Sequence, residues 1–172
     1  MDIIQFDGNG YKVEVLKKAP FTFIRDKLVI VEGGDDELNR KVLDSKFVDI
    51  LLDPHQGYRK DKIYQKDSGL NEVLCQLAKE NDIAIGFSLS LILNSNRRGE
   101  LFGRIIQNIK LCKKYKVKMI IGTFAKNKSE LRNEKDDEAL FKILGMNVID
   151  REFVKKRLEF KKKFVRNGVR LE

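Results

Sequence analysis

The sequence predicts an α/β fold with a mainly parallel sheet, formed by a single domain that spans residues 1–172. Short apolar runs alternate with segments of helical periodicity through most of the chain, which is typical of parallel α/β proteins. Within Ile83–Ala125, an apolar run, a long helical segment and a second apolar run follow one another with almost no spare residues. The two strands of such a βαβ unit are parallel. Because 42% of the residues are hydrophobic, a chain of this length can bury a substantial core.

The N-terminal part, to about residue 27, is expected to be irregular. Residues 2–6 and 11–17 alternate in hydropathy around an Asp-Gly-Asn-Gly segment, which predicts two short strands joined by a turn. Almost no helical pattern is present in residues 1–34.

Five later apolar runs predict neighbouring parallel strands, at residues 28–31, 48–52, 83–89, 119–124 and 147–149. The segments between and after these runs predict helices that begin at Asp35 or Asp36, at Asp67 or Ser68, near Arg97, in the acidic segment before Leu144, and at Asp150. Most of these starts carry a side chain that can accept hydrogen bonds from the first free N–H groups of a helix.

The positive charge is concentrated in two segments of the chain. The net charge is +9, and residues 97–118 carry +7 while residues 151–172 carry +6. Such a field attracts a polyanion, and nucleic acid is the commonest one in the cytoplasm. No apolar run approaches the roughly 20 residues of a membrane span, and the first residues show no basic leader or cleavable apolar segment. We therefore expect a cytoplasmic protein without a membrane partner.

The basic side chains of residues 97–118 form what we call the cationic ridge. Arg97 and Arg98 lie at the expected N-terminal end of the helix, where positive charge opposes the helix macrodipole. Gly103 lies on the outward face, where glycine costs roughly 1 kcal/mol relative to alanine. Helix stability explains neither feature, so a phosphodiester backbone or a partner protein is expected to approach this face. The alternative is a solvated helix face.

Residues for catalysis or metal binding are scarce. Cys75 and Cys112 fall on the apolar sides of predicted helices, which indicates two reduced, buried thiols. The single histidine, His55, follows a predicted strand, and Asp49 and Asp53 lie nearby. These three are few for a multinuclear metal site, and no phosphate-binding loop, nucleophile elbow or nucleophile–base pair is present. We expect no catalytic residue, no bound metal and no cofactor.

Several segments resemble the ribonuclease P protein component 3 family, the archaeal counterpart of the eukaryotic thirty-kilodalton ribonuclease P subunit. They are DSGLNEVLCQLAKENDIAIGFSLSLIL, GRIIQNIKLCKKYKVKMIIGTFA, the ELR and DD that lead into ALFKILGM, and the C-terminal FVRNGVRLE. The resemblance runs from about Leu28 to the end of the chain. It implies a TIM-barrel-like fold related to metal-dependent phosphoesterases of the polymerase-and-histidinol-phosphatase superfamily, but without a known catalytic role. Members of the family open with a fuller set of βα units than residues 1–34 provide, so we expect a reduced or distorted barrel.

The resemblance also implies a function. The family helps the catalytic RNA of ribonuclease P to remove the 5′ leader of precursor tRNA, in a complex with protein component 2. We therefore expect a subunit that is not catalytic alone and that neutralises RNA phosphates. The candidate RNA-binding residues are Arg97, Arg98, Arg104, Lys110, Lys114, Lys126, Arg132, Lys161 and Arg170. Two alternatives stay open: a reduced metal-dependent phosphoesterase that uses Asp49, Asp53 and His55, and a basic scaffold that binds only protein.

Overall fold

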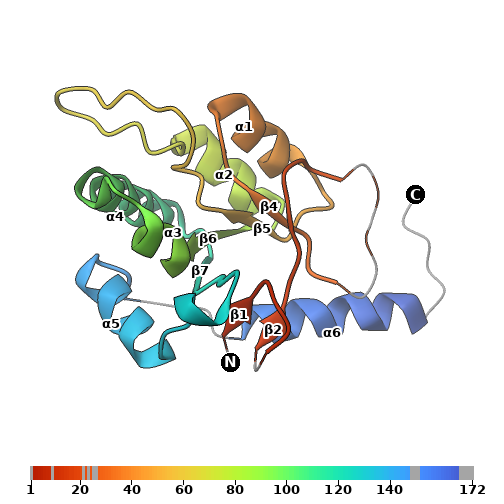
Figure 1. Ribbon diagram of the computed structural model, residues 1–172. Helices are drawn as coiled ribbons and strands as arrows, with labels where there is room; N and C mark the ends of the chain where they lie inside the picture. The colour runs from red at the N-terminus through yellow and green to blue at the C-terminus, as the bar shows by residue number, and fades with distance from the viewer. Residues whose placement is uncertain are drawn as a thin grey trace.

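The computed structural model describes residues 2–8, 10–20, 22, 24, 27–147 and 152–166, with side chains up to residue 162 (Figure 1). The strands are β1 (Ile3–Ile4), β2 (Tyr11–Lys12), β3 (Val15–Leu16), β4 (Ile30–Glu32), β5 (Ile50–Leu52), β6 (Ala84–Ser88) and β7 (Met119–Gly122). The helices are α1 (Asp36–Asp44), α2 (Glu72–Glu80), α3 (Leu89–Asn94), α4 (Arg98–Tyr115), the 3-10 turn η1 (Lys128–Glu130), α5 (Glu134–Ile143) and α6 (Phe153–Arg166).

The strands close into a ring. β3, β4, β5, β6 and β7 form one sheet in this order, and every neighbouring pair is parallel. β2 and β3 belong to one segment, residues 11–16, whose first half pairs with β1 and whose second half pairs with β4. β1 also lies beside the end of β7, where Ile4 bridges to Ala125 and the Gln5 N–H donates to Ala125 O at 2.8 Å. The fold is therefore a reduced, TIM-barrel-like α/β fold.

Successive strand residues point to opposite sides of the barrel wall. Ile30, Ile50 and Ala84 are register partners on adjacent strands, and all three belong to the apolar cluster inside the ring. The next residue of each strand belongs to a second cluster, between the wall and the helices. This alternation is the period of two that an extended strand imposes.

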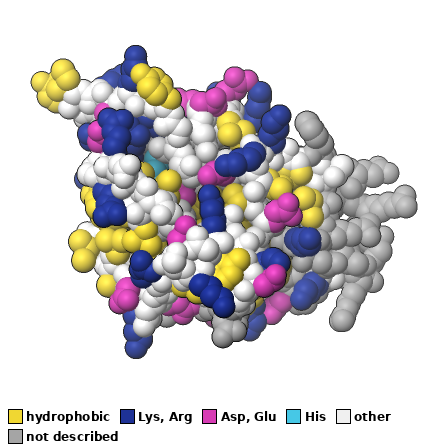
Figure 2. Space-filling model, in the orientation of Figure 1, with side chains coloured by type: hydrophobic (Ala, Val, Ile, Leu, Met, Phe, Trp, Pro, Cys, Tyr) yellow, Lys and Arg dark blue, Asp and Glu magenta, His cyan; other side chains and the backbone are white. Residues whose placement is uncertain are grey.

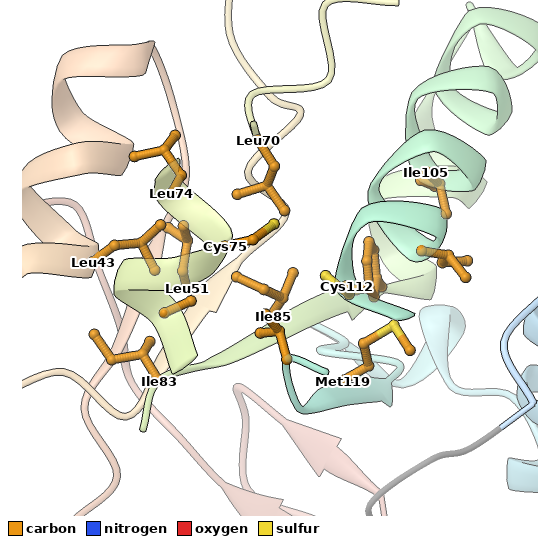
Figure 3. Close-up of a cluster of buried hydrophobic side chains, with 14 of the residues drawn as sticks. Leu43, Leu51, Leu70, Leu74, Cys75, Ile83, Ile85, Ile105, Cys112 and Met119 are labelled. Atoms are coloured by element: carbon orange, nitrogen blue, oxygen red, sulfur yellow. The ribbon is translucent and has the colours of Figure 1, made fainter. Parts of the chain in front are cut away.

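Helices α1, α2 and α4 cover the outside of the barrel wall. Figure 3 shows Leu43 of α1, Cys75 of α2 and Cys112 of α4 gathered around Ile85 of β6. Both cysteines are buried and free, as the sequence indicated. The predicted helices therefore form the outer layer of the fold.

Helix α6 closes the end of the barrel at which the strands begin (Figure 1). Phe153 and Val154 from its first turn pack into the inner cluster. Further along, Arg157 Nε lies 2.7 Å from Asp49 Oδ1, and Asp49 directly precedes β5. The opposite end of the barrel, where the strands finish, is left for loops.

Three sequence expectations about elements need correction. The N-terminal strands exist, but they pair in parallel and not across a tight turn. Helix α2 was expected to begin at Asp67 or Ser68, but it begins at Glu72 with Asn71 as its cap. Gly69 has a positive φ of 74°, which is not helical, so the helix cannot start before it. Helix α3 was not predicted, since its residues continue the apolar run of β6.

The strands expected at residues 28–31, 48–52, 83–89 and 119–124 are confirmed as parallel neighbours β4 to β7. For the strand expected at 147–149, residues 148 and 149 lie outside the described residues, and so does the expected helix start at Asp150. Within the described ranges, no helix has the length and hydropathy needed to cross a membrane.

Candidate nucleic-acid interface

Helix α4 carries the cationic ridge on the outside of the barrel. Its apolar residues Leu101, Ile105, Ile109 and Cys112 are buried against the outer cluster. Because these residues recur every three or four positions, the basic side chains are directed to other faces of the helix. The helix and its orientation are thus as the sequence predicted.

Arg98 has a structural partner that the sequence did not show. Its Nε donates to Ile92 O at 3.1 Å, and its Nη2 donates to Leu93 O at 2.7 Å. Both carbonyls lie in the last turn of α3, where carbonyls lack partners within their own helix. A cation is favourable at this C-terminal end even though it opposes the macrodipole of α4. The position of Arg98 is therefore explained by α3.

Arg104 also has a structural role. Only 12% of its side chain is exposed, its Nε lies 3.0 Å from Asp61 Oδ1, and its Nη2 donates to Arg59 O at 3.2 Å. Gly103 next to it is covered by Lys66, whose Cε would lie 3.3 Å from a Cβ at that position. The close approach inferred from this glycine is thus made by the protein itself. The expectation that a phosphodiester backbone or a partner protein approaches the helix at Gly103 is therefore corrected.

Six of the predicted RNA-binding residues are exposed to solvent: Arg97, Arg98, Lys110, Lys114, Lys126 and Arg132. Arg98 is bonded to the end of α3, which leaves the other five. Arg97 is 77% exposed, and its Nη2 lies 2.7 Å from Glu100 Oε1. Exposed ion pairs of this kind contribute little to stability and exchange readily with solvent. These five cations can therefore reach a polyanion without disturbing the core.

Lys161 is not available to RNA. Its side chain is 3% exposed, its Nζ lies 2.5 Å from Asp49 Oδ2, and it donates to Lys27 O at 3.0 Å. The expectation that Lys161 contacts RNA is corrected by this burial, because a phosphate cannot reach the ammonium group. Arg170 lies outside the described residues.

A cavity of about 180 Å³ lies at the end of the barrel where the strands finish. Its polar lining comes from residues at or just after strand ends, among them Gln5, Glu32, Asp53, Ser88 and Lys126. Asp53 is buried and accepts hydrogen bonds from the backbone N–H and the hydroxyl of Ser88. Burial raises the pKa of Asp53 to about 7, although the Ser88 bonds lower it.

The three residues considered for a metal site do not all converge, although His55 Nε2 lies 3.9 Å from Asp53 Oδ1. Asp49 and Asp53 stand at opposite ends of β5, and Asp49 is held by Arg157 and Lys161. His55 is 1% exposed and stacks on Phe87 with ring centroids 6.2 Å apart. Neither of its nitrogens has a hydrogen-bond partner among the described residues. In the described part of the chain, no group of three or more His, Cys, Asp and Glu residues is arranged to hold a metal ion.

The two buried groups His55 and Asp53 make the stability of the protein depend on pH in opposite directions. Burial and the nearby Arg59 and Arg104 lower the pKa of His55 to about 3. The unfolded chain therefore takes up the His55 proton first as pH falls through about 6.5, and this lowers stability. Asp53 has a raised pKa, so its contribution to stability is present at low pH and is lost as pH rises from about 4 to 7.

We expect His55→Phe to gain stability relative to wild type on going from pH 7.5 to pH 5, by on the order of 1 kcal/mol per pH unit below about 6.5. Asp53→Asn should lose stability relative to wild type over the same interval. Urea unfolding at several pH values measures the free energy of unfolding of both variants. A change in packing that does not depend on pH shifts each profile as a whole and leaves its slope unchanged. Parallel pH profiles for wild type and both variants would contradict the prediction.

The loop at residues 56–68, between β5 and α2, was not among the predicted RNA-binding segments. It contains large side chains that are almost fully exposed, Tyr58 at 87%, Ile63 at 91% and Tyr64 at 99%. Lysines 60, 62 and 66 alternate with them and are also exposed. The interleaving of aromatic and basic residues in YRKDKIYQK was the available signal.

The buried Arg59 holds the base of the 56–68 loop. Only 2% of its side chain is exposed. Its guanidinium bonds to the Asp36 and Asp67 carboxylates at 2.8 and 2.7 Å, and donates to the carbonyls of Gln56, Pro54 and Gly34. The buried Arg59 therefore anchors the loop to the barrel rim.

Comparisons with known proteins agree on one family. The family described as RNase P subunit p30 matches residues 24–159. Ribonuclease P protein component 3 of Methanosarcina barkeri is 34% identical over 121 residues, which covers 69% of this chain and 47% of the relative. The protein of the same name in Methanocaldococcus jannaschii is 33% identical over 155 residues, covering 80% of this chain and 63% of the relative.

A solved structure supports the same relationship. A chain of the cryo-EM structure of archaeal ribonuclease P with mature tRNA is similar to this chain with a TM-score of 0.66 and 28% identity. The match covers 83% of this chain and 61% of that chain. The present chain thus spans about half to two thirds of the length of the proteins it matches.

Proposed function

Because the chain belongs to the RNase P subunit p30 family, we propose that it acts as a protein subunit of ribonuclease P. In this role it binds the catalytic RNA of the enzyme and supports that RNA as it removes the 5′ leader of precursor tRNA. A protein of the component 2 type is its partner within the complex, and precursor tRNA is met through the complex. The similar solved chain comes from a ribonuclease P with mature tRNA, which supports this assignment.

The observation that carries the proposal is the exposed part of the cationic ridge. Lys110 and Lys114 are exposed and lie four residues apart on α4, so they are neighbours on one helix face. Within the described part of the chain, neither forms an ion pair with a carboxylate. Lysines of this kind can exchange their counterions for RNA phosphates, which favours binding by counterion release.

Reconstitution tests the proposed role directly. The chain is added to the cognate catalytic RNA, with and without a component 2 protein, and cleavage of precursor tRNA is followed. We expect the chain to bind the RNA and to increase the rate of leader removal in the presence of its partner. A folded chain that neither binds the RNA nor changes the cleavage rate would overturn the proposal.

We expect the triple change Arg97→Gln, Lys110→Gln and Lys114→Gln to weaken RNA binding and leave the free energy of unfolding within about 0.5 kcal/mol of wild type. Each lost phosphate contact should reduce the slope of log affinity against log salt by up to about 0.9. Filter binding across a salt series and urea unfolding measure these quantities.

A matched control removes the same charge elsewhere, with Arg40→Gln, Lys46→Gln and Lys79→Gln at exposed positions. We expect this control to bind RNA nearly as wild type does. Equal losses in the two triple variants would show that only the total charge matters.

A further inference from the structure

The 56–68 loop projects from the barrel as a separate feature. In Figure 1 it extends at the upper left, above α4. In the same region of Figure 2, hydrophobic side chains project into solvent beside Lys and Arg side chains. Between 87% and 99% of the surface is exposed for each of Tyr58, Ile63 and Tyr64. Such exposure is unusual for large apolar side chains that lie together.

The loop is held in a defined shape. Arg59 anchors it to the barrel rim, and Arg104 of α4 bonds to both Asp61 and Arg59 O. Gln107 of α4 accepts from Lys66 N at 3.1 Å and donates to Lys66 O at 2.8 Å. At the tip, Lys62 N donates to the carbonyl of Gln65 at 2.9 Å. A pre-organised loop loses less conformational entropy when it binds a partner.

A hollow of about 340 Å³ lies beneath the loop. Three lysines line it, Lys60, Lys62 and Lys66. The two carboxylates in its lining, Asp36 and Asp67, are both bonded to the buried Arg59. Lys66 Nζ lies 3.1 Å from Asp61 Oδ2, whereas Lys60 and Lys62 form no ion pair with a carboxylate among the described residues. These two lysines therefore supply the positive charge that attracts an anionic group of phosphate size to the hollow.

We propose that the 56–68 loop binds unpaired nucleotides of RNA, with a base stacked on Tyr58 or Tyr64 and a neighbouring phosphate in the lysine-lined hollow. This inference rests on the proposed function, since it takes RNA as the partner of the chain. Exposed aromatic rings beside cations are the arrangement that single-stranded nucleic acid recognises, because an unpaired base offers a free face for stacking. A duplex does not offer that face along its length.

The composition of the loop favours RNA over a protein partner. Lys60 lies over the ring of Tyr58, with Nζ 5.8 Å from the ring centroid. Lys62 follows at the tip next to Ile63 and Tyr64. The cores of protein–protein interfaces are depleted in lysine, because an ammonium group loses its hydration there. Lysines between the exposed rings therefore fit a phosphate-bearing ligand better than an apolar pocket.

The inference is tested with the full chain and two probes, a short uridine oligonucleotide and the cognate catalytic RNA. The chain contains four tyrosines and no tryptophan, so stacking on Tyr58 or Tyr64 can be followed as quenching of tyrosine fluorescence. We expect Tyr58→Ala with Tyr64→Ala to lower affinity for the oligonucleotide by about 5- to 150-fold and to leave the salt slope unchanged. Lys60→Gln with Lys62→Gln should instead lower the salt slope by about 0.7 per lost contact.

Matched controls are Ile143→Ala, which removes another exposed apolar side chain, and Lys46→Gln with Lys79→Gln. Thermal unfolding verifies that each variant is folded. The inference is overturned if the tyrosine variant binds both probes as wild type does. It is also overturned if that variant keeps RNA affinity and loses affinity for a component 2 protein, because the loop is then a protein-docking surface.

RNA binding by wild type and by the loop variants separates a failure of the proposed function from a failure of the loop inference. If wild type does not bind the catalytic RNA at all, the proposed function fails and the loop inference fails with it. If wild type binds in a manner that depends on the cationic ridge, and loop variants bind equally well, the loop inference alone is wrong.

Discussion

Replacing Arg59 with methionine is expected to lower the free energy of unfolding by about 3–5 kcal/mol. The guanidinium is almost fully buried and bonds to two carboxylates and three backbone carbonyls. Methionine fills much of the same volume but donates no hydrogen bond. Pro54 O then keeps only its bond from Asn39 Nδ2 at 2.8 Å, and the carbonyls of Gln56 and Gly34 also lose a donor. Each polar group that is left buried and unsatisfied costs about 1–3 kcal/mol.

Part of this cost is expected to be recovered from solvent. Asp36 is 75% exposed and Asp67 is 35% exposed, so both carboxylates can hydrate once the cation is gone. The 56–68 loop should also lose its defined shape, because Arg59 joins its base to Gly34 and Pro54. We therefore expect faster proteolysis within the loop in addition to the lower stability.

Urea unfolding and limited proteolysis measure these two effects. Arg40→Met is the control, because Arg40 is an exposed arginine on α1. We expect the control to stay within about 0.5 kcal/mol of wild type. If Arg59→Met were no more destabilising than Arg40→Met, Arg59 would not be the anchor of the loop.

Lys161→Met is expected to lower the free energy of unfolding by a similar amount, about 3–5 kcal/mol. The Lys161 ammonium and the Asp49 carboxylate are both buried at the end of the barrel that α6 closes. Removing the ammonium leaves the Asp49 carboxylate bonded to Arg157 and to the Val29 N–H. The negative charge of a buried carboxylate is poorly stabilised once one of its cations is removed, because water cannot reach the site to replace that cation.

Lys162→Met is the matched control, because Lys162 is exposed on the same helix. A double-mutant cycle with Asp49→Asn isolates the energy between the two charges. We expect the double variant to be more stable than the sum of the two single losses predicts. Strict additivity would mean that the two side chains contribute independently, against the geometry of the pair.

The order of the elements and their parallel arrangement could be predicted from the sequence. Hydrophobic periodicity is a local property, so the period of α4 and the apolar runs of β4 to β7 could be recognised without knowledge of distant contacts. A strand, a helix and a second strand in direct succession then leave a parallel pair as the outcome. The segments that resemble the ribonuclease P family could likewise be recognised from the sequence.

Tertiary structure alone decided which charges are free. Arg104 and Lys161 were expected to contact RNA, as were Lys110 and Lys114, and nothing local distinguishes these two pairs. Lys161 is bonded to Asp49, 112 positions away, and Arg104 to Asp61, 43 positions away. The number of possible partners for a long cationic side chain grows with the chain, and only packing selects one. The same holds for closure of the barrel, which depends on Ile4 meeting Ala125. The interleaved aromatic and basic residues of the 56–68 loop are visible in the sequence. That Arg59 and Arg104 hold the base of this loop, while Tyr58 and Tyr64 stay exposed, follows only from tertiary contacts.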